Sequence, residues 1–454
     1  MTLLTQPTLF GFPAVRGRWL ILPLGILVLL CLGSIYTWTI FVKPLQELLQ
    51  LSATESLLPF TAVLLFYSIF TTLTGLFLEK IGIRRAAAIS GLIVGLGYIL
   101  SSFANTTPQL VLAYGLVVGI GAGIGYGVPI AVAAKWFPDK KGLAVGTTVI
   151  GFGLSPFISA PIARQLITLY GVRPTFIILG VAFSAIILAI APFLVSPPPG
   201  WHPQPSSSTQ STASQSSETN SPPLWRTRRF YGLWVCYAIG VFMGVATIGI
   251  ASPVAQETIR LDATTAAFSV SIFAIFNGAS RPFFGWLTDW VKPKKAAIAS
   301  YTLSLIASIL MIQASPGDVH TYLVAFSLFA FGFGGWLALA PTATLSLFSS
   351  QNFARNYGII FAAYGVGAVA GTLIAGQCRD LFGSYNAFFY PTLVLSIVGI
   401  LWATFMLKAQ PQRRSEPLFA ECVQCVSYNP LTQTCQIATS GASDTLECNN
   451  FQAL

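Results

Sequence analysis

Charge is what this chain has least of. Only 8% of its 454 residues are Asp, Glu, Lys or Arg, whereas a soluble domain usually carries about 25% charged residues. Apolar residues make up 54% of the chain. This composition excludes an ordinary soluble domain and indicates a protein that lies within a membrane.

The apolar residues are gathered in about twelve long stretches. A membrane span needs roughly 20 apolar residues to cross about 30 Å of hydrocarbon. Because backbone groups cannot remain unpaired in lipid, such spans are helical. We therefore predict an all-α membrane protein with twelve transmembrane helices. The predicted spans are 19–41, 57–78, 85–104, 110–132, 142–165, 174–195, 231–252, 265–288, 295–314, 320–348, 356–379 and 385–407.

The positive charges lie mainly on one side of these spans. Most of the 24 Lys and Arg residues fall in segments that an even number of spans places with the two termini. The other side holds only Lys43, Arg164, Arg173, Arg260 and Arg379. Basic loops stay in the cytoplasm, so we predict a plasma (inner) membrane protein with both termini cytoplasmic. This bias explains the net charge of +10 without nucleic-acid binding.

The chain divides into two similar halves. Residues 197–229 form a polar, Ser- and Pro-rich cytoplasmic linker, which separates six spans in 1–196 from six in 230–408 and leaves a cytoplasmic tail at 409–454. A loop motif recurs at an offset of 210 residues, and internal repeats are typical of secondary transporters. We interpret this motif as a conformational latch. Its members are Gly75, Glu79, Arg84 and Arg85, which recur as Gly285, Asp289, Lys294 and Lys295.

One charge lies deep within a span. We place only Arg281 inside an apolar stretch. A charge in a membrane span is costly, so it usually faces the bundle interior and marks a substrate path. A lone cation suggests an anion site. The alternative is that Arg281 caps backbone carbonyls or helps to hold the bundle together.

Several segments resemble a known family. Gly75-Leu-Phe-Leu-Glu-Lys-Ile-Gly-Ile-Arg-Arg85 resembles the signature loop of the major facilitator superfamily. Four further stretches resemble the oxalate/formate antiporter family within that superfamily. They are Tyr36-Thr-Trp38, Lys135-Trp-Phe-Pro-Asp-Lys-Lys-Gly-Leu-Ala144, Asn277-Gly-Ala-Ser-Arg-Pro-Phe-Phe-Gly285 and Ala354-Arg-Asn-Tyr-Gly358. The resemblance implies two pseudo-symmetric six-helix bundles, alternating access, and exchange or uptake of small carboxylates.

The same resemblance implies a substrate site. Arg281 falls on the family's carboxylate-binding arginine, and Tyr36 and Tyr126 fall on aromatic positions that line its cavity. A lysine that the family's oxalate antiporters carry in the eleventh span is replaced here by Tyr364. In the tenth span, Phe333 and Leu337 replace a tryptophan and a tyrosine, with Trp336 alongside. The predicted substrate-binding residues are Arg281, Tyr36, Tyr126, Tyr364, Phe333, Trp336 and Asn277.

The missing lysine bears on the substrate. A dianion in a low-dielectric cavity needs two positive partners, because an uncompensated buried charge costs several kcal/mol. Arg281 alone balances a monoanion and pairs with a carboxylate through two parallel hydrogen bonds. We therefore favour formate, pyruvate, lactate or glycolate. Transport of oxalate in exchange for formate remains an alternative, and the aromatic residues could equally be ordinary packing groups.

The absence of other chemistry narrows the function. We place no Asp, Glu or His in the apolar body of a span, and such residues commonly relay protons. Exchange, or transport driven by the anion gradient, is therefore favoured. We see no acid–base or nucleophile constellation that would indicate an enzyme. We also see no ring of polar groups that would line the pore of a channel. The expected partners are a small organic anion and the lipid bilayer, without cofactor or nucleic acid, and a monomer is expected.

The tail contains a group of cysteines. Cys-x-x-Cys with two further thiols could hold zinc, but the later spacings are irregular, and we expect a disordered tail. A membrane sensor that signals through this tail is a further alternative. The four cysteines are Cys422, Cys425, Cys435 and Cys448.

Overall fold

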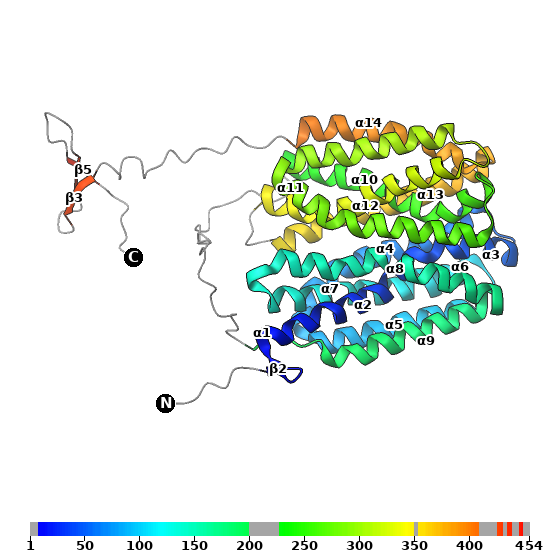
Figure 1. Ribbon diagram of the computed structural model, residues 1–454, viewed down its shortest axis with the longest axis horizontal. Coiled ribbons are helices and arrows are strands. Elements are labelled where there is room, and N and C mark those ends of the chain that lie inside the picture. The colour runs from blue at the N-terminus through cyan, green and yellow to red at the C-terminus, as the bar shows by residue number, and fades with distance from the viewer. Residues whose placement is uncertain are drawn as a thin grey trace. The chain divides into compact units, whose positions relative to one another are not determined.

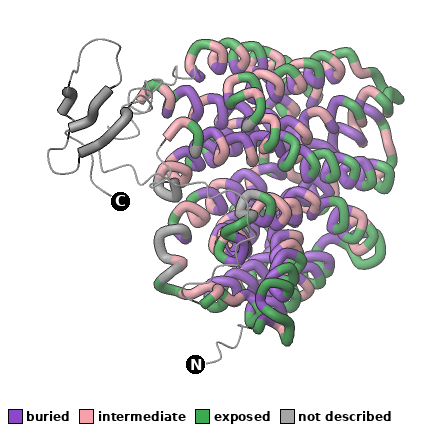
Figure 2. The backbone as a smooth tube through the Cα atoms, turned by 60° about the vertical axis from the view of Figure 1, so that its left-hand side comes forward, coloured by how far each residue is buried: buried purple, intermediate pink, exposed green. Residues whose placement is uncertain are grey.

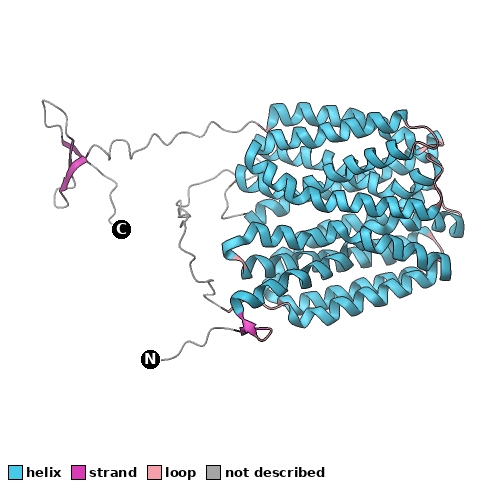
Figure 3. Cartoon of the chain, viewed as in Figure 1, coloured by secondary structure: helices cyan, strands magenta, loops and turns pink. Residues whose placement is uncertain are grey.

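The computed structural model describes residues 8–198, 227–348 and 353–407, with three short segments at 425–429, 434–437 and 445–447. Within these ranges the side chains of 75–77, 79, 140–142, 289, 345 and 353–355 are not described. The chain forms two compact units, Met1–Leu407 and Lys408–Leu454. The first is almost entirely helical (Figure 3). Twelve helical segments in the described ranges could cross a membrane, which confirms the predicted class.

Helices before the linker form the first half of this unit. The first span contains α1 (Ala14–Gly17), η1 (Arg18–Leu20), α2 (Ile21–Gly33), η2 (Ser34–Trp38) and α3 (Thr39–Leu49). The next spans are α4 (Ala53–Ile81), α5 (Ile83–Ser102), the continuous α6 (Thr107–Leu110), η3 (Val111–Val118) and α7 (Gly119–Trp136), then η4 (Pro138–Lys140) with α8 (Lys141–Tyr170), and α9 (Val172–Ile190) with η5 (Ala191–Phe193). A short hairpin, β1 (Thr8–Leu9) and β2 (Phe12–Pro13), precedes them.

Helices after the linker form the second half. They are α10 (Arg228–Glu257), α11 (Ala263–Gln313), α12 (Val319–Leu347), α13 (Phe353–Phe382), η8 (Tyr385–Phe388) and α14 (Phe389–Met406). The residues of α11 make up both the eighth and the ninth span. The chain turns sharply between these two spans at Lys292. In Figure 1 the two halves gather on either side of a seam.

Burial follows the membrane setting. Large apolar side chains such as Leu92, Leu112, Val181 and Phe405 are exposed on the outside of the unit, where lipid would cover them. Small and aromatic residues are common among the buried ones, and Figure 2 shows how buried and exposed positions alternate along the helices. Lipid is as apolar as leucine, so helix association depends on close packing and on interhelical hydrogen bonds rather than on the hydrophobic effect.

Three helix pairs join the halves. Helix α4 packs on α13 and α8 packs on α11, and a smaller contact joins α3 to α10. Hydroxyl groups cross the first contact: Thr61 Oγ1 lies 2.6 Å from Thr372 Oγ1, and Ser68 Oγ donates to the Phe361 carbonyl at 3.3 Å. These paired polar groups fix the register of the seam.

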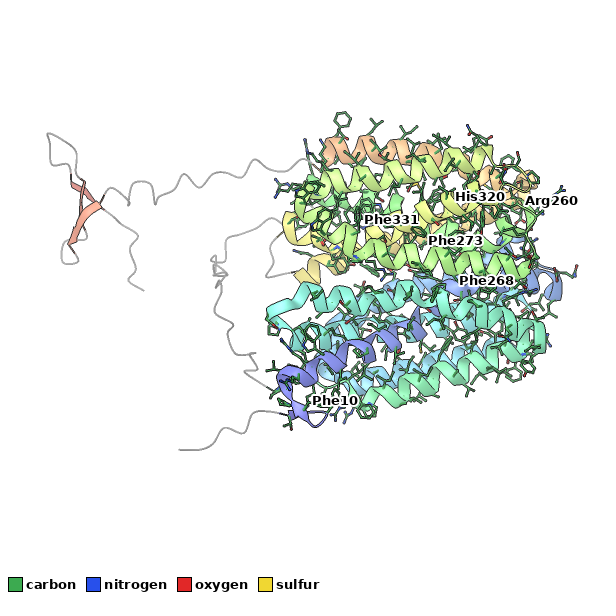
Figure 4. All side chains as sticks on the ribbon, viewed as in Figure 1. Phe10, Arg260, Phe268, Phe273, His320 and Phe331 are labelled. Atoms are coloured by element: carbon green, nitrogen blue, oxygen red, sulfur yellow. The ribbon has the colours of Figure 1, made fainter. Side chains whose placement is uncertain are left out.

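The two ends of the unit are easily told apart. Phe10, α1 and the last residue of α14 lie at one end, which we call the linker end. Arg260 and the turn between α3 and α4 lie at the opposite end, which we call the far end (Figure 4).

A buried ion pair explains the Lys135–Ala144 motif at the linker end. Arg18 is 5% exposed and donates to both carboxylate oxygens of Asp139, at 2.5 and 2.9 Å. It also donates to the Trp136 carbonyl at 3.3 Å, and its guanidinium lies 4.6 Å from the Phe137 ring centre. The motif therefore holds the start of the first span against the loop before α8.

The repeated loop motif has the same backbone in both halves. Gly82 has φ 84° and ψ 143°, and Lys292, which follows it by the same offset, has φ 71° and ψ 156°. This left-handed conformation suits glycine, which has no Cβ. It reverses the chain between two spans at each repeat. The side chains of Glu79 and Asp289 are not described, so the latch stays a prediction.

The tail differs from the expected disorder. Three short strands, β3 (Cys425–Asn429), β4 (Thr434–Ile437) and β5 (Thr445–Glu447), form an antiparallel sheet in the order β3-β4-β5. The β-branched and aromatic residues Val426, Tyr428, Ile437 and Thr445 favour strands, a signal that the cysteine pattern obscured. Cys422, Cys448 and the side chains of the other two cysteines lie outside the described residues.

The backbone at Lys292 leads to a stability prediction. A non-glycine residue in this region costs about 1–3 kcal/mol, whereas glycine adds only about 0.5–1 kcal/mol of backbone entropy. Lys292→Gly should therefore raise the thermal midpoint of the purified protein. Lys294→Gly, in the regular helix two residues later, should lower it. Equal destabilisation by both changes, measured by tryptophan fluorescence in detergent, would contradict the strain at Lys292.

Candidate functional site

Arg281 lies in the seam between the halves. It is 3% exposed and belongs to α11, between the start of that helix and its turn at Lys292. Its Nη1 donates to the Val149 carbonyl of α8 at 2.7 Å, and its Nη2 donates to Asn277 Oδ1 at 3.3 Å. The arginine therefore bonds to both halves and does cap a carbonyl in this conformation.

No carboxylate pairs with Arg281 among the described residues. The ion pairs there are Arg18–Asp139, Lys43–Glu257 and Arg379–Glu257. Arg18 is the other buried cation of this part of the chain, and it is neutralised by its partner. Arg281 thus carries an uncompensated positive charge, the arrangement that favours an anion nearby.

Two buried donors beside each other lack acceptors. Arg281 Nε and Asn277 Nδ2 have no hydrogen-bond partner within the described part of the chain. Buried polar groups are nearly always paired, and each exception needs an explanation. Asn277 lies one turn before Arg281 and is 2% exposed. Together they offer two N–H donors to one acceptor group.

A glycine on the opposite helix makes this arrangement possible. A Cβ placed on Gly153 of α8 would lie 2.7 Å from Asn277 Oδ1 and 3.0 Å from Arg281 Nε and Nη2. These separations are shorter than ordinary van der Waals contacts. The absent side chain therefore lets α8 approach the guanidinium and the amide.

A small cavity adjoins these residues. Its volume is about 20 Å³, and a single water needs about 10–15 Å³ measured in the same way. The cavity has no room for an organic anion, so this conformation is closed at its centre. The lining residues come from both halves: Tyr36, Gly153, Pro156, Thr247, Ile248, Ala251, Val270, Phe273, Ala274, Asn277, Phe326 and Ala330. Phe273, on α11, is labelled in Figure 4.

Aromatic rings close the seam beside the cavity. Tyr36 and Tyr364, one from each half, share a hydrogen bond between their hydroxyl groups at 2.9 Å. The Tyr36 ring also contacts Phe152 and Phe333, with ring centres 5.3 and 5.9 Å apart. Tyr67 of α4 packs against Tyr364 at 5.7 Å. The two halves therefore meet through rings that can separate without breaking a helix.

A break in the first span presents Tyr36. Residues Ser34–Trp38 form the tighter 3₁₀ helix η2 between α2 and α3, and such a stretch within a helix often marks a hinge. The Trp38 indole N–H donates to the Ser56 carbonyl at 2.9 Å, and Thr37 Oγ1 lies 2.5 Å from Ser159 Oγ. These bonds anchor the residues that follow the tyrosine to α4 and α8.

The predicted site residues differ in their distance from the cavity. Tyr36 and Asn277 line it, Arg281 bonds to Asn277, and Tyr364 and Phe333 follow through ring contacts. Tyr126 reaches this group through the rings of Phe152, at 5.1 Å, and Tyr67, at 5.4 Å.

Trp336 lies farther away. It packs against Gly240, Tyr237 and Tyr301 within the second half. Its indole N–H has no hydrogen-bond partner within the described residues, and Tyr237 connects it to Tyr364 at 6.4 Å. Its role in the site stays a prediction.

Sequence reasoning missed several residues of the site. Gly153, the Val149 carbonyl, Phe152 and Tyr67 come from α4 and α8. Their sequence carries no signal beyond an apolar helix. Their importance follows only from which helices meet at the seam.

A twelve-span helical unit with a buried cation between two halves defines a membrane transporter. The chain matches the profile of the Major Facilitator Superfamily over residues 24–352 and 241–440. It belongs to this superfamily. It is therefore a multi-pass integral membrane protein and a secondary transporter, not an enzyme.

Curated relatives include several carriers. The chain is 28% identical over 354 residues to an uncharacterized MFS-type transporter, YhjX, of Escherichia coli, covering 78% of this chain and 86% of that protein. It is 27% identical to the oxalate:formate antiporter of Oxalobacter formigenes, covering 86% and 92%. Monocarboxylate transporter 12 of Xenopus laevis is 28% identical, covering 70% and 72%.

Solved structures agree on the fold. A bacterial homolog of the human lysosomal transporter Spinster, inward-facing and unoccupied, aligns with a TM-score of 0.66 at 14% identity, covering 86% of this chain and 95% of that one. A peptide transporter in complex with sulfate aligns with a TM-score of 0.67 at 14% identity, covering 88% and 96%. The predicted fold of this superfamily is thereby confirmed.

The close approach at Gly153 predicts opposite effects for two alanines. Gly153→Ala should overpack the seam and lower stability by about 1–3 kcal/mol. Gly278→Ala is the control, because its Cβ would meet neighbours only at 3.8 Å or beyond. Replacing that helical glycine should raise stability by up to about 1 kcal/mol. If thermal unfolding in detergent shows Gly153→Ala to be as stable as Gly278→Ala, the seam is looser than described.

Proposed function

We propose that this chain carries small monocarboxylates across the membrane by alternating access, with Arg281 as the carboxylate anchor. The observation that carries the proposal is the pair of buried donors without acceptors, Arg281 Nε and Asn277 Nδ2, beside an uncompensated charge. A carboxylate supplies both the missing acceptors and the missing negative charge. The oxalate:formate antiporter and the monocarboxylate transporter among the relatives support this substrate class.

The number of cations favours a monoanion. Arg281 is the one buried cation without an ionic partner in the described ranges. Arginine offers a planar fork that matches a single carboxylate. Tyr364, which is completely buried, adds only a neutral hydroxyl group. A second carboxylate would therefore remain uncompensated, at a cost of several kcal/mol.

The closed conformation suggests how binding and movement are linked. The bond from Arg281 Nη1 to the Val149 carbonyl joins α11 to α8. A carboxylate that takes this donor replaces the carbonyl and releases α8. The Tyr36–Tyr364 bond crosses the same seam, and its rings must part to admit a substrate. Binding at the anchor is thus coupled to separation of the halves.

Orientation and driving force complete the proposal. Basic residues such as Arg16, Arg84 and Lys294 gather at the linker end, which we place in the cytoplasm of the plasma (inner) membrane. No carboxylate or histidine is buried in the described spans. We therefore propose exchange or gradient-driven transport rather than proton coupling through an embedded acid.

The anchor role gives a direct test. Arg281→Gln should reduce formate uptake into proteoliposomes to background, because the neutral amide supplies no counter-charge. Arg281→Lys should also be severely impaired, since a point charge does not reproduce the planar fork. Arg173→Gln is the control, because that arginine is exposed and bonds to Asn105 within the described residues. Wild-type uptake by correctly folded Arg281→Gln would rule out the anchor.

A second cation should change the preferred substrate. Tyr364→Lys places an ammonium group at the seam beside Tyr36 and should favour oxalate over formate in competition assays. Tyr364→Phe removes the same hydroxyl group without adding charge and should show no gain for oxalate. Tight oxalate binding by the unmodified protein would favour an oxalate/formate antiporter instead.

A further inference from the structure

A second cavity, with polar walls, lies at the far end of the seam. Its volume is about 160 Å³, several times the space that one water requires and enough for a small carboxylate. The first half contributes Ile40, Lys43, Pro44, Glu47 and Arg164, and the second half contributes Ser252, Gln256 and Ala263. We call it the far-end pocket.

An ion cluster beside this pocket joins the halves. Glu257 of α10 pairs with Lys43 of α3, across the seam, and with Arg379 of α13 at 2.6 Å. The three side chains are only 21–34% exposed. Each oxygen of one carboxylate thus serves a different cation.

A helix cap reinforces this closure. Asp380 of α13 accepts the backbone N–H groups of Ala53 and Thr54, at 2.9 and 2.8 Å, at the start of α4. A carboxylate at a helix N-terminus is favoured by the helix dipole. At this end of the unit, α13 is therefore joined to the start of α4 as well as to α10.

Arg164 is the unpaired member of the pocket. No carboxylate contacts its side chain in the described ranges, and its buried Nε has no acceptor. Lys43 and Arg379 both pair with Glu257, whereas Arg164 lines the pocket without an ionic partner in the described ranges. An unpaired cation therefore lines a cavity that can hold a small anion.

We propose that the far-end pocket is a separate docking site for a small carboxylate, held by Arg164 and Lys43. The docked anion competes with Glu257 for Lys43. Arrival of a substrate thereby weakens the ion pair that keeps the far end closed. This inference extends the proposed function, because it supplies an entry site for the anion that Arg281 later binds.

Competition is physically reasonable at this position. The side chains of the pair keep 21–23% of their surface exposed, so an anion arriving from water can reach it. An anion that gains Arg164 as a second partner can replace one carboxylate oxygen on Lys43. The amide of Gln256, which donates to Ser252 Oγ at 2.9 Å, lies in the wall as a neutral donor. Salt should weaken docking, because exposed charges are screened within about 10 Å at 0.1 M.

Transport kinetics test the docking site. Arg164→Gln should raise the KM for formate offered at the far end roughly fivefold and reduce its dependence on ionic strength. The KM at the linker end should not change. Arg164→Lys should restore much of the affinity, and Arg173→Gln, another arginine of the far end, should match the wild type. Sidedness is fixed by protease access to a tag on the C-terminus. Equal KM values and salt dependence for Arg164→Gln and Arg173→Gln would overturn the proposal.

A labelling experiment tests anion binding in the far-end pocket without measuring transport. Gln256→Cys, made in the Arg281→Gln protein, is treated with a thiosulfonate reagent, and the peptide carrying position 256 is quantified by mass spectrometry. Sodium formate should slow labelling, and sodium chloride at equal ionic strength should slow it less. Adding Arg164→Gln should abolish the difference. Formate protection that persists without Arg164 would contradict the docking site, even if carboxylate transport by the anchor is confirmed.

The opposite result is that formate protects position 256 from labelling while the wild type transports no carboxylate. This result would support the docking site and contradict the function proposed for Arg281.

Discussion

The cost of an uncompensated charge in a membrane governs this structure. Arg281 has no carboxylate partner in the described part of the chain. Its guanidinium donates hydrogen bonds to a backbone carbonyl and to a neighbouring side-chain amide. Such neutral acceptors stabilise a guanidinium less well than an anion does. The closed conformation therefore leaves the arginine partly satisfied. In the function that we propose, an entering carboxylate takes the place of these acceptors and frees α8 from α11.

Packing at the seam is arranged around the same group. The missing side chain at Gly153 lets α8 reach Arg281, while Tyr36 and Tyr364 meet beside them through one hydrogen bond. Ring contacts and single hydrogen bonds are each worth about 0.5–1.5 kcal/mol. The halves are thus held by many small contacts. A carrier needs this balance, because one dominant contact would lock it in a single state.

Local features of the sequence predicted the spans and the depth of Arg281, since hydropathy and charge can be read residue by residue. The repeat was also visible, and the matching backbone at Gly82 and Lys292 supports it. The partners across the seam were not predictable. Lys43 and Arg379 appeared only as charges on one side, and nothing in their spacing showed that Glu257 joins them. The packing of Trp336 against Gly240 was not predictable either. Contacts between distant helices depend on the whole fold.

The far end and the centre use the same physical device. At the centre, a cation of the second half binds a carbonyl of the first, and at the far end a carboxylate of the second half binds a lysine of the first. Each contact closes the seam by occupying a cation. In the functions that we propose, an incoming carboxylate competes for that cation at both places, so closure and substrate binding are alternatives for the same donors. A carrier of this kind needs no separate trigger, because the carried anion itself opens the path.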